Sequence, residues 1–84
     1  MKIIKTTDFD KTLRKLPADI QQLVNQQEIR FAKDPSDPRL HLKKLHGKPY
    51  FSLRVTNRYR VLFYFIDETT AKWFNIDHRK DVYR

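Results

Sequence analysis

Four residues in the second half of the chain carry side chains suited to chemistry on a phosphodiester. Arg60 interrupts an otherwise apolar run from Tyr59 to Ile66, and His78, Arg79 and Tyr83 lie close together near the C-terminus. A histidine transfers protons near neutral pH. An arginine stabilises a crowded anionic phosphate, and a tyrosine stacks on a base or donates a proton. These groups suffice to cleave RNA through its own 2′-hydroxyl, without a metal.

A plainer interpretation stands beside this one. A histidine near a chain end is weak evidence of any activity, and the segment alone also fits a solvated tail. His41 and His46 are five positions apart, with no acid or cysteine near them, so we interpret them as surface loop histidines. The sequence therefore predicts no metal site and no cofactor.

Arg60 is the residue that the plain interpretation explains least well. A guanidinium on a central apolar strand is partly desolvated, and a buried charge is costly without a partner. Either an acid such as Asp77 or Asp81 pairs with it, or it faces an open groove. An arginine suits the groove because its planar fork donates two parallel hydrogen bonds to phosphate oxygens.

The positive charge of the chain is concentrated around this strand. The formal net charge is +8, and residues 1–38 are nearly balanced. No acid occurs from Arg39 to Ile66, whereas seven basic residues do: Arg39, Lys43, Lys44, Lys48, Arg54, Arg58 and Arg60. A segregated charge attracts polyanions. Candidate RNA-binding residues are Lys43, Lys44, Lys48, Arg58 and Lys80, although the three loop lysines also fit a solvated loop.

Composition and length indicate the class of protein to which the chain belongs. The chain has 84 residues, 39% hydrophobic and 13% aromatic, which predicts a single folded domain over residues 1–84. It has no cysteine, so no disulfide can form. No apolar stretch approaches the ~18 residues that cross a bilayer, so we expect no membrane association and a cytoplasmic location.

The first half has helical periodicity. A short strand is expected over residues 2–6, and Thr7 with Asp10 looks like a helix cap and its capping-box partner. Pro17 separates this helix from a second one. The buried stripe of the second helix is expected at Ile20, Leu23, Val24, Gln27 and Phe31. Prolines 35 and 38 end that helix.

The second half has strand periodicity. Residues 51–55 alternate as a half-buried strand, and residues 59–66 read as a central strand covered on both sides. A third strand over residues 71–77 is expected to place Phe74, Ile76 and His78 on one face and Trp73 with Asn75 on the other. Two helices followed by an antiparallel meander predict an α+β fold with one sheet face left partly open.

These motifs, taken in order along nearly the whole chain, resemble the RelE/ParE superfamily of bacterial toxins. The residues that carry the resemblance are Phe9, Leu13, Leu16 and Pro17, then Asp34 and Pro35, then Leu42, Leu45 and Gly47, then Leu53, Arg54, Val55, Tyr59, Arg60 and Val61, and finally His78, Arg79 and Tyr83. Each motif alone is weak, and the ordered set is fairly specific.

The resemblance implies a toxin of a type II toxin–antitoxin system. Its expected fold is an N-terminal strand and a two-helix hairpin packed on a twisted antiparallel sheet of about four strands. RelE-like members cut mRNA in the ribosomal A site, so the expected partners are the ribosome, mRNA and a cognate antitoxin whose C-terminal segment wraps the toxin. ParE-like members inhibit DNA gyrase instead, without nuclease activity. A simple nucleic-acid-binding module is a third, non-enzymatic hypothesis.

The resemblance also implies roles for single residues. Arg60 matches an arginine that contacts the scissile phosphate, Arg54 a basic strand position, and Arg79 with Tyr83 the C-terminal pair of RelE-like nucleases. His78 matches a histidine that relatives use as acid or base. Ser52 departs from the pattern, because some RelE proteins have a catalytic lysine there. The general base would then be His78 or Lys48.

Overall fold

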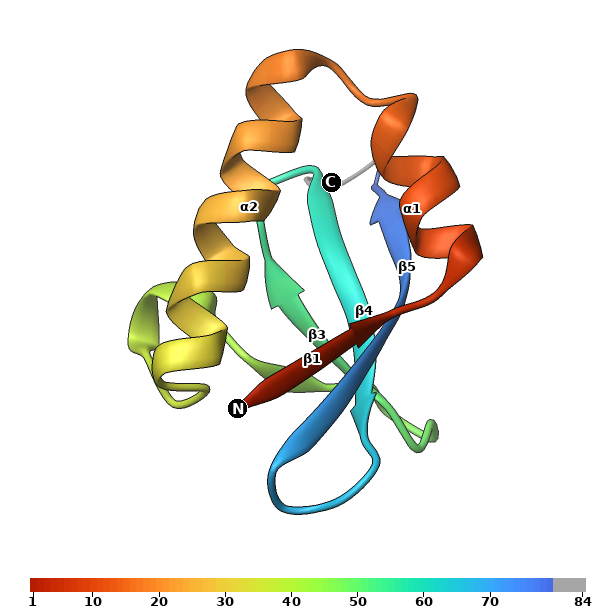
Figure 1. The fold of residues 1–84 in the computed structure, drawn as a ribbon. Coiled ribbons are helices and arrows are strands. Elements are labelled where there is room, and N and C mark those ends of the chain that lie inside the picture. The colour runs from red at the N-terminus through yellow and green to blue at the C-terminus, as the bar shows by residue number, and fades with distance from the viewer. Residues whose placement is uncertain (80–84) are drawn as a thin grey trace.

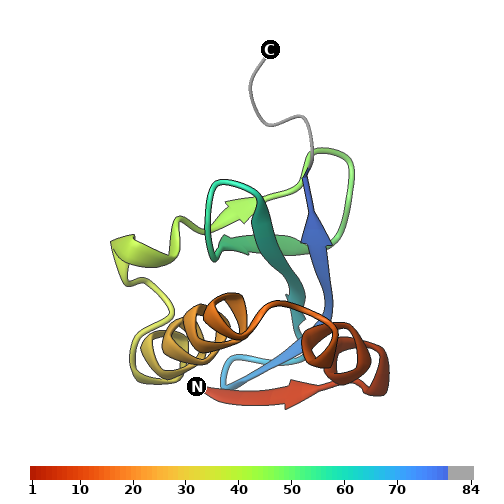
Figure 2. The same cartoon turned by 90° about the horizontal axis from the view of Figure 1, so that it is seen from above.

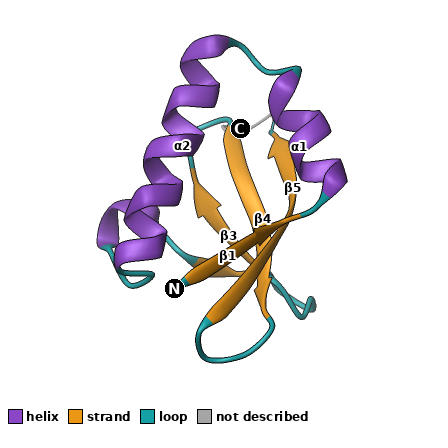
Figure 3. Ribbon diagram, in the orientation of Figure 1, coloured by secondary structure: helices purple, strands orange, loops and turns teal. Residues whose placement is uncertain are grey.

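The computed structural model describes residues 1–79 as two α-helices packed on one sheet (Figures 1 and 3). In chain order the elements are β1 (Lys2–Lys5), α1 (Thr7–Arg14), α2 (Ala18–Lys33), the 3-10 helix η1 (Pro38–Leu40), β2 (Lys43–Lys44), β3 (Phe51–Arg54), β4 (Tyr59–Phe65) and β5 (Thr70–His78). Among these residues, neither helix is long and apolar enough to span a membrane.

The sheet has five strands in the order β1-β5-β4-β3-β2. The predicted α+β class, with an N-terminal strand and a helical hairpin, is confirmed. Strands β3, β4 and β5 pair antiparallel as expected, and β2 pairs antiparallel with β3, but β1 joins the edge of the sheet parallel to β5, so the sheet is mixed. The short β2 also adds a strand that the sequence did not predict, because its two residues carry no alternation to read.

The cap of α1 lies one residue earlier than the sequence predicted. Thr6, not Thr7, is the N-cap, and its Oγ1 accepts a hydrogen bond from the amide of Phe9 at 3.1 Å. The backbone amide of Thr6 also donates to the carbonyl of Trp73 at 3.0 Å. Because this bond to β5 fixes Thr6 in an extended conformation, the helix begins directly after it.

The core lies between the helices and one face of the sheet (Figure 2). Phe9 of α1 and Phe31 of α2 are fully buried, and both pack edge-on against Trp73 of β5, with ring centroids 5.7 and 5.5 Å apart. Val24 and Gln27 of the predicted helical stripe are also buried. The helices therefore cover the sheet face that carries Leu53, Val61 and Phe63, as predicted.

A β-bulge in β5 overturns the predicted alternation of that strand. Leu62 pairs with Asn75 and Phe63 with Trp73, so Phe74 is an extra residue in the ladder. The insertion shifts the phase, and Trp73 and Ile76 both face the core. Phe74 lies on the other face instead, where its ring contacts Tyr50 and Tyr64.

The prediction that residues 59–66 are covered on both sides is correct only for the first part of β4. Val61, Leu62 and Phe63 are buried. Tyr64, Phe65 and Ile66 are 37%, 38% and 49% exposed. Phe65 still stacks on Phe31 of α2, with ring centroids 6.3 Å apart, so β4 remains against the helices at this point. The face opposite the helices, called here the outer face, carries the polar and aromatic residues described next.

Candidate nucleic-acid interface

A row of charged residues crosses the outer face of the sheet. Arg54 of β3 pairs in register with Arg60 of β4, and Arg60 pairs with Asp77 of β5. Residues directly opposite one another in an antiparallel ladder project from the same face. The alternation along β4 sends Val61 and Phe63 to the core, so Arg60 projects away from it.

Arg54 and Arg60 of this row line a groove of about 190 Å³. The groove is lined by His41, Lys43, Ser52, Arg54, Thr56, Asn57, Tyr59, Arg60 and Arg79. The three arginines that the resemblance singled out are thus gathered from two strands and the end of a third. Among residues 1–79, no acidic residue is part of the lining, so this part of the groove is cationic and suits a phosphate group.

The sequence left open whether Arg60 pairs with an acid or faces an open groove, and the structure shows both. The Arg60 Nε donates to Asp77 Oδ2 at 3.0 Å, and the same oxygen lies 2.9 Å from an Arg60 terminal nitrogen. The Arg60 side chain is 25% exposed and that of Asp77 38% exposed. The guanidinium is therefore oriented by Asp77 while part of it stays accessible from the groove.

The turn between β3 and β4 fixes the position of Arg79. Thr56 Oγ1 accepts hydrogen bonds from the amides of Arg58 and Tyr59 at 3.1 and 3.2 Å, which closes the turn. The carbonyl of Arg58 then accepts a hydrogen bond from the amide of Arg79 at 2.6 Å. This bond extends the pairing of β4 and β5 by one residue and brings Arg79 to the rim of the groove.

Ser52 lies inside the groove, and Lys43 lies beside it. Ser52 is 5% exposed, and its partner across the β2–β3 ladder is Lys43. Both residues line the groove. A lysine ammonium is therefore present at this wall although the strand position itself holds a serine.

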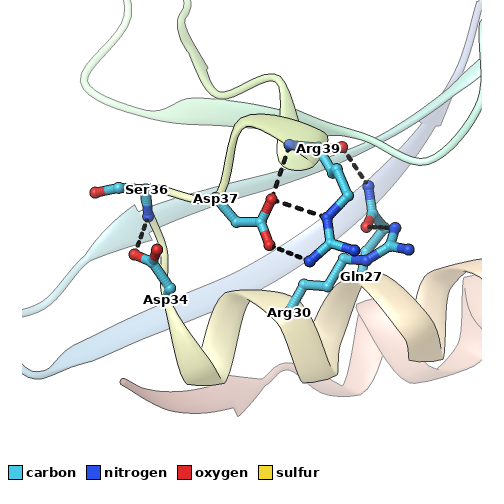
Figure 4. A network of polar contacts seen from close by, with 6 residues as sticks. All are labelled: Gln27, Arg30, Asp34, Ser36, Asp37 and Arg39. Carbon is cyan, nitrogen blue, oxygen red and sulfur yellow. Dashed lines mark hydrogen bonds and ion pairs between the residues drawn. The ribbon is translucent and has the colours of Figure 1, made fainter.

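Gln27 of α2 connects the backbone of two groove-forming segments, and its contacts with Arg39 and Arg30 are drawn in Figure 4. Its Nε2 donates to the carbonyl of Arg54 at 2.6 Å and to that of Arg39 at 3.1 Å, and its Oε1 accepts from Arg30 at 2.9 Å. Gln27 is 5% exposed. One buried amide thus joins β3 to the segment that leads into the groove.

The same segment is shaped by Asp37 and Arg39 (Figure 4). The Asp37 carboxylate caps η1 by accepting from the Arg39 amide at 2.9 Å, and it pairs with the Arg39 guanidinium at 2.7 Å. The side-chain hydrogen bond from Arg39 lowers the pKa of Asp37 to about 2. The turn is therefore held by an ionised carboxylate at neutral pH.

His41 reaches the groove, which the sequence did not predict. It follows η1 as the C-cap, with φ 48 and ψ 54 in the left-handed region. Histidine tolerates this conformation better than most side chains. The prediction of an exposed loop histidine is correct, but the sequence carried no signal that the turn directs it to the arginines.

Four of the predicted site residues within residues 1–79 are not part of the groove lining. His78 stacks on Tyr59, with ring centroids 4.4 Å apart and planes 6° from parallel, and it is not part of the groove lining. Lys44, Lys48 and Arg58 are exposed outside the lining. Lys80, Asp81 and Tyr83 lie outside the described residues.

No model of a known protein family matches the chain, and no curated protein matches it either. Solved structures do match. The RelE–RelB complex of the archaeon Pyrococcus horikoshii is 16% identical, with a TM-score of 0.78 over 95% of this chain and 96% of the other. A YoeB/ParE toxin from Agrobacterium tumefaciens is 15% identical, with a TM-score of 0.77 over 94% and 99%.

One match is closer in sequence. The toxin–antitoxin complex RelBE2 of Mycobacterium tuberculosis is 30% identical, with a TM-score of 0.75 over 93% of this chain and 96% of the other. The chain therefore belongs to the RelE/ParE toxin superfamily. Its class is that of the toxins of type II toxin–antitoxin systems.

Proposed function

We propose that this toxin is an mRNA endonuclease that acts on ribosome-bound message. The observation that carries the proposal is the groove, because Arg54, Arg60 and Arg79 line one small cationic hollow although they are distant in sequence. A groove of this size admits a phosphate group, and its guanidiniums donate charge-assisted hydrogen bonds to phosphate oxygens.

The chemistry follows from these groups. The 2′-oxygen of the message attacks the adjacent phosphorus after losing its proton to a base. The bond from phosphorus to the 5′-oxygen breaks, and that oxygen takes a proton, leaving a 2′,3′-cyclic phosphate and a 5′-hydroxyl. The arginines stabilise the extra negative charge of the pentacovalent phosphate. Lys43 supplies a further cation beside Ser52, at the position where some RelE proteins have a lysine.

Two histidines are candidates for proton transfer. His78 is the one that the resemblance implies, but it stacks on Tyr59 instead of lining the groove. His41 lines the groove together with Arg60. Proton transfer requires a group within hydrogen-bond reach of the reacting atom. The geometry therefore favours His41, with Tyr83 retained as the candidate residue for stacking on the message.

The proposed partners are the ribosome, its mRNA and an antitoxin. Matching structures from Pyrococcus horikoshii and Mycobacterium tuberculosis are toxin–antitoxin complexes. A strongly cationic toxin suits an acidic partner segment that folds on binding. Such a segment would neutralise the groove and keep the toxin inactive.

The test is induced expression of the wild type and of Arg60→Ala, with protein synthesis and DNA replication followed separately. The proposal predicts that the wild type stops protein synthesis before DNA replication and that toe-prints appear at A-site codons. Arg60→Ala should neither stop protein synthesis nor give these toe-prints. Intact message under arrested growth would overturn it.

A ParE-like gyrase inhibitor is the second candidate function. The placement of His78 favours it, because the residue expected to move protons stacks on Tyr59 and is not itself part of the groove lining. It predicts that replication stops before translation, with DNA damage signalling, and that His78→Ala and Tyr83→Phe stay toxic. The same expression experiment separates the two candidates.

A further inference from the structure

The outer face of the sheet carries a second hollow, built from aromatic rings. It measures about 390 Å³ and is lined by Pro49, Tyr50, Tyr64, Phe65 and Phe74. The ring of Phe74 lies 5.1 Å from that of Tyr50 and 5.8 Å from that of Tyr64. Tyr64 is 37% exposed although it is a large aromatic residue on a sheet.

The β-bulge creates this hollow. Phe63 pairs with Trp73 and Leu62 with Asn75, so Phe74 is an extra residue without a partner on β4. This extra residue places its ring on the outer face. Bulges commonly redirect a side chain beside functional sites. The carbonyl of Phe74 also accepts a hydrogen bond from Thr6 Oγ1 at 3.3 Å, so the bulge is anchored to the N-cap of α1.

A cation stands beside the rings. Lys72 of β5 is the register partner of Tyr64, so the two side chains project from the same face. Aromatic rings flanked by cations are the usual surface for single-stranded nucleic acid, since the rings stack on bases while the cations contact phosphates.

The hollow and the groove share one face of the sheet. Arg60 and Tyr64 are four residues apart on β4, which is about 13 Å along a strand. This span corresponds to about four stacked nucleotides at roughly 3.4 Å each. Leu62 lies between Arg60 and Tyr64 on β4 and is part of neither lining, so the groove and the hollow are separate sites on that face.

We propose that the aromatic hollow of Tyr50, Tyr64 and Phe74 is a stacking site for an unpaired RNA base, a few nucleotides from the phosphate held by Arg60. This inference rests on the proposed function for the identity of the strand. We favour RNA as the occupant because the hollow lies on the same sheet face as the arginines of the groove. Lys72 can contact a phosphate while the ring of Tyr64 stacks on the base.

The test measures binding of two probes by fluorescence anisotropy. One is a 2′-O-methyl RNA of about eight nucleotides, within the usual site size, which cannot be cleaved through its 2′-oxygen. The other has the same backbone without bases. Tyr64→Leu keeps an apolar side chain but removes the ring, and Tyr64→Phe keeps the ring as the matched control.

The proposal predicts that Tyr64→Leu binds the intact probe about five-fold or more weakly and the abasic probe as the wild type does. Tyr64→Phe should bind both probes normally. Lys72→Gln should weaken both probes and reduce the salt dependence by about one charge. Equal binding of the intact probe by Tyr64→Leu and wild type overturns the stacking site.

Other results separate this proposal from the proposed function. Arg60→Ala should weaken both probes, because it removes a phosphate contact. If that occurs while Tyr64→Leu changes nothing, the groove stands and the stacking site is wrong. If Tyr64→Leu leaves RNA binding intact but Tyr64→Ala weakens an antitoxin complex, the hollow is a protein-docking surface. A wild type that binds neither probe overturns both proposals.

Discussion

Arg60 on β4 and Asp77 on β5 are register partners, and the arginine Nε donates to the aspartate Oδ2 at 3.0 Å. Both side chains are partly exposed, so the ion pair contributes at most about 1 kcal/mol to folding. Its larger consequence is for binding. A phosphate that enters the groove must compete with Asp77 for the guanidinium or share it.

Asp77→Asn tests that competition. Removing the carboxylate charge should tighten binding of single-stranded RNA by up to about five-fold, because Arg60 no longer shares its charge. Titration of a labelled oligonucleotide at two salt concentrations measures this. Glu68→Gln, an exposed residue of the β4–β5 turn, makes the same charge change elsewhere. Equal effects of the two variants, or weaker binding by Asp77→Asn, would contradict the competition.

Gln27→Ala should destabilise the chain by about 1–3 kcal/mol. The substitution removes the donor to the carbonyls of Arg54 and Arg39 and leaves both in a part-buried site. Urea unfolding measures the change. The exposed neighbour Gln26→Ala is the control and should stay within about 0.5 kcal/mol of the wild type. Equal stability of the two variants would show that the buried amide does not hold the groove framework.

The Asp37 carboxyl should titrate with a pKa of about 2 instead of its ordinary 3.8, because the Arg39 side chain donates to it. A lowered carboxyl pKa means that the contribution of this group to stability is present above about pH 4 and is lost as the pH falls through about 2. Carbon NMR of the side-chain carboxyl gives the midpoint. Arg39→Gln should return it toward 3.8, and a wild-type midpoint already near 3.8 would contradict the assigned pair.

His41 and His78 form a matched pair for the proton-transfer step. His41→Ala should slow single-turnover cleavage of ribosome-bound message by about 100-fold. His78→Ala should have a much smaller effect, because His78 stacks on Tyr59. The opposite ranking would assign proton transfer to His78.

Much of the fold could be read from local pattern. The stripe of α2 was predicted at Ile20, Leu23, Val24, Gln27 and Phe31. Val24, Gln27 and Phe31 are buried, as a 3.6-residue period predicts, whereas Leu23 is 36% exposed. The parallel pairing of β1 with β5 could not be read in that way, since it joins strands separated by most of the chain. The bulge at Phe74 was also missed, because two aromatic residues in sequence satisfy either phase of the alternation.

The groove was predicted in part. Arg54, Arg60 and Arg79 were expected from the resemblance, and the structure brings them together. His41 was missed because its position depends on the Asp37 cap and on the hydrogen bonds of Gln27, which follow from tertiary contacts. His78 was expected to act beside the arginines, but its ring stacks on Tyr59 and is not itself part of the groove lining.

The central claim is that Arg60 binds the phosphate at which the message is cut, and purified ribosomes with message in the A site test it most directly. Single-turnover cleavage by Arg60→Ala should be about 100-fold slower or more than by the wild type. Its free energy of unfolding should change by less than about 1 kcal/mol, so lost activity cannot be assigned to unfolding. Cleavage by Arg60→Ala at the wild-type rate, or no cleavage by the wild type, would contradict the claim.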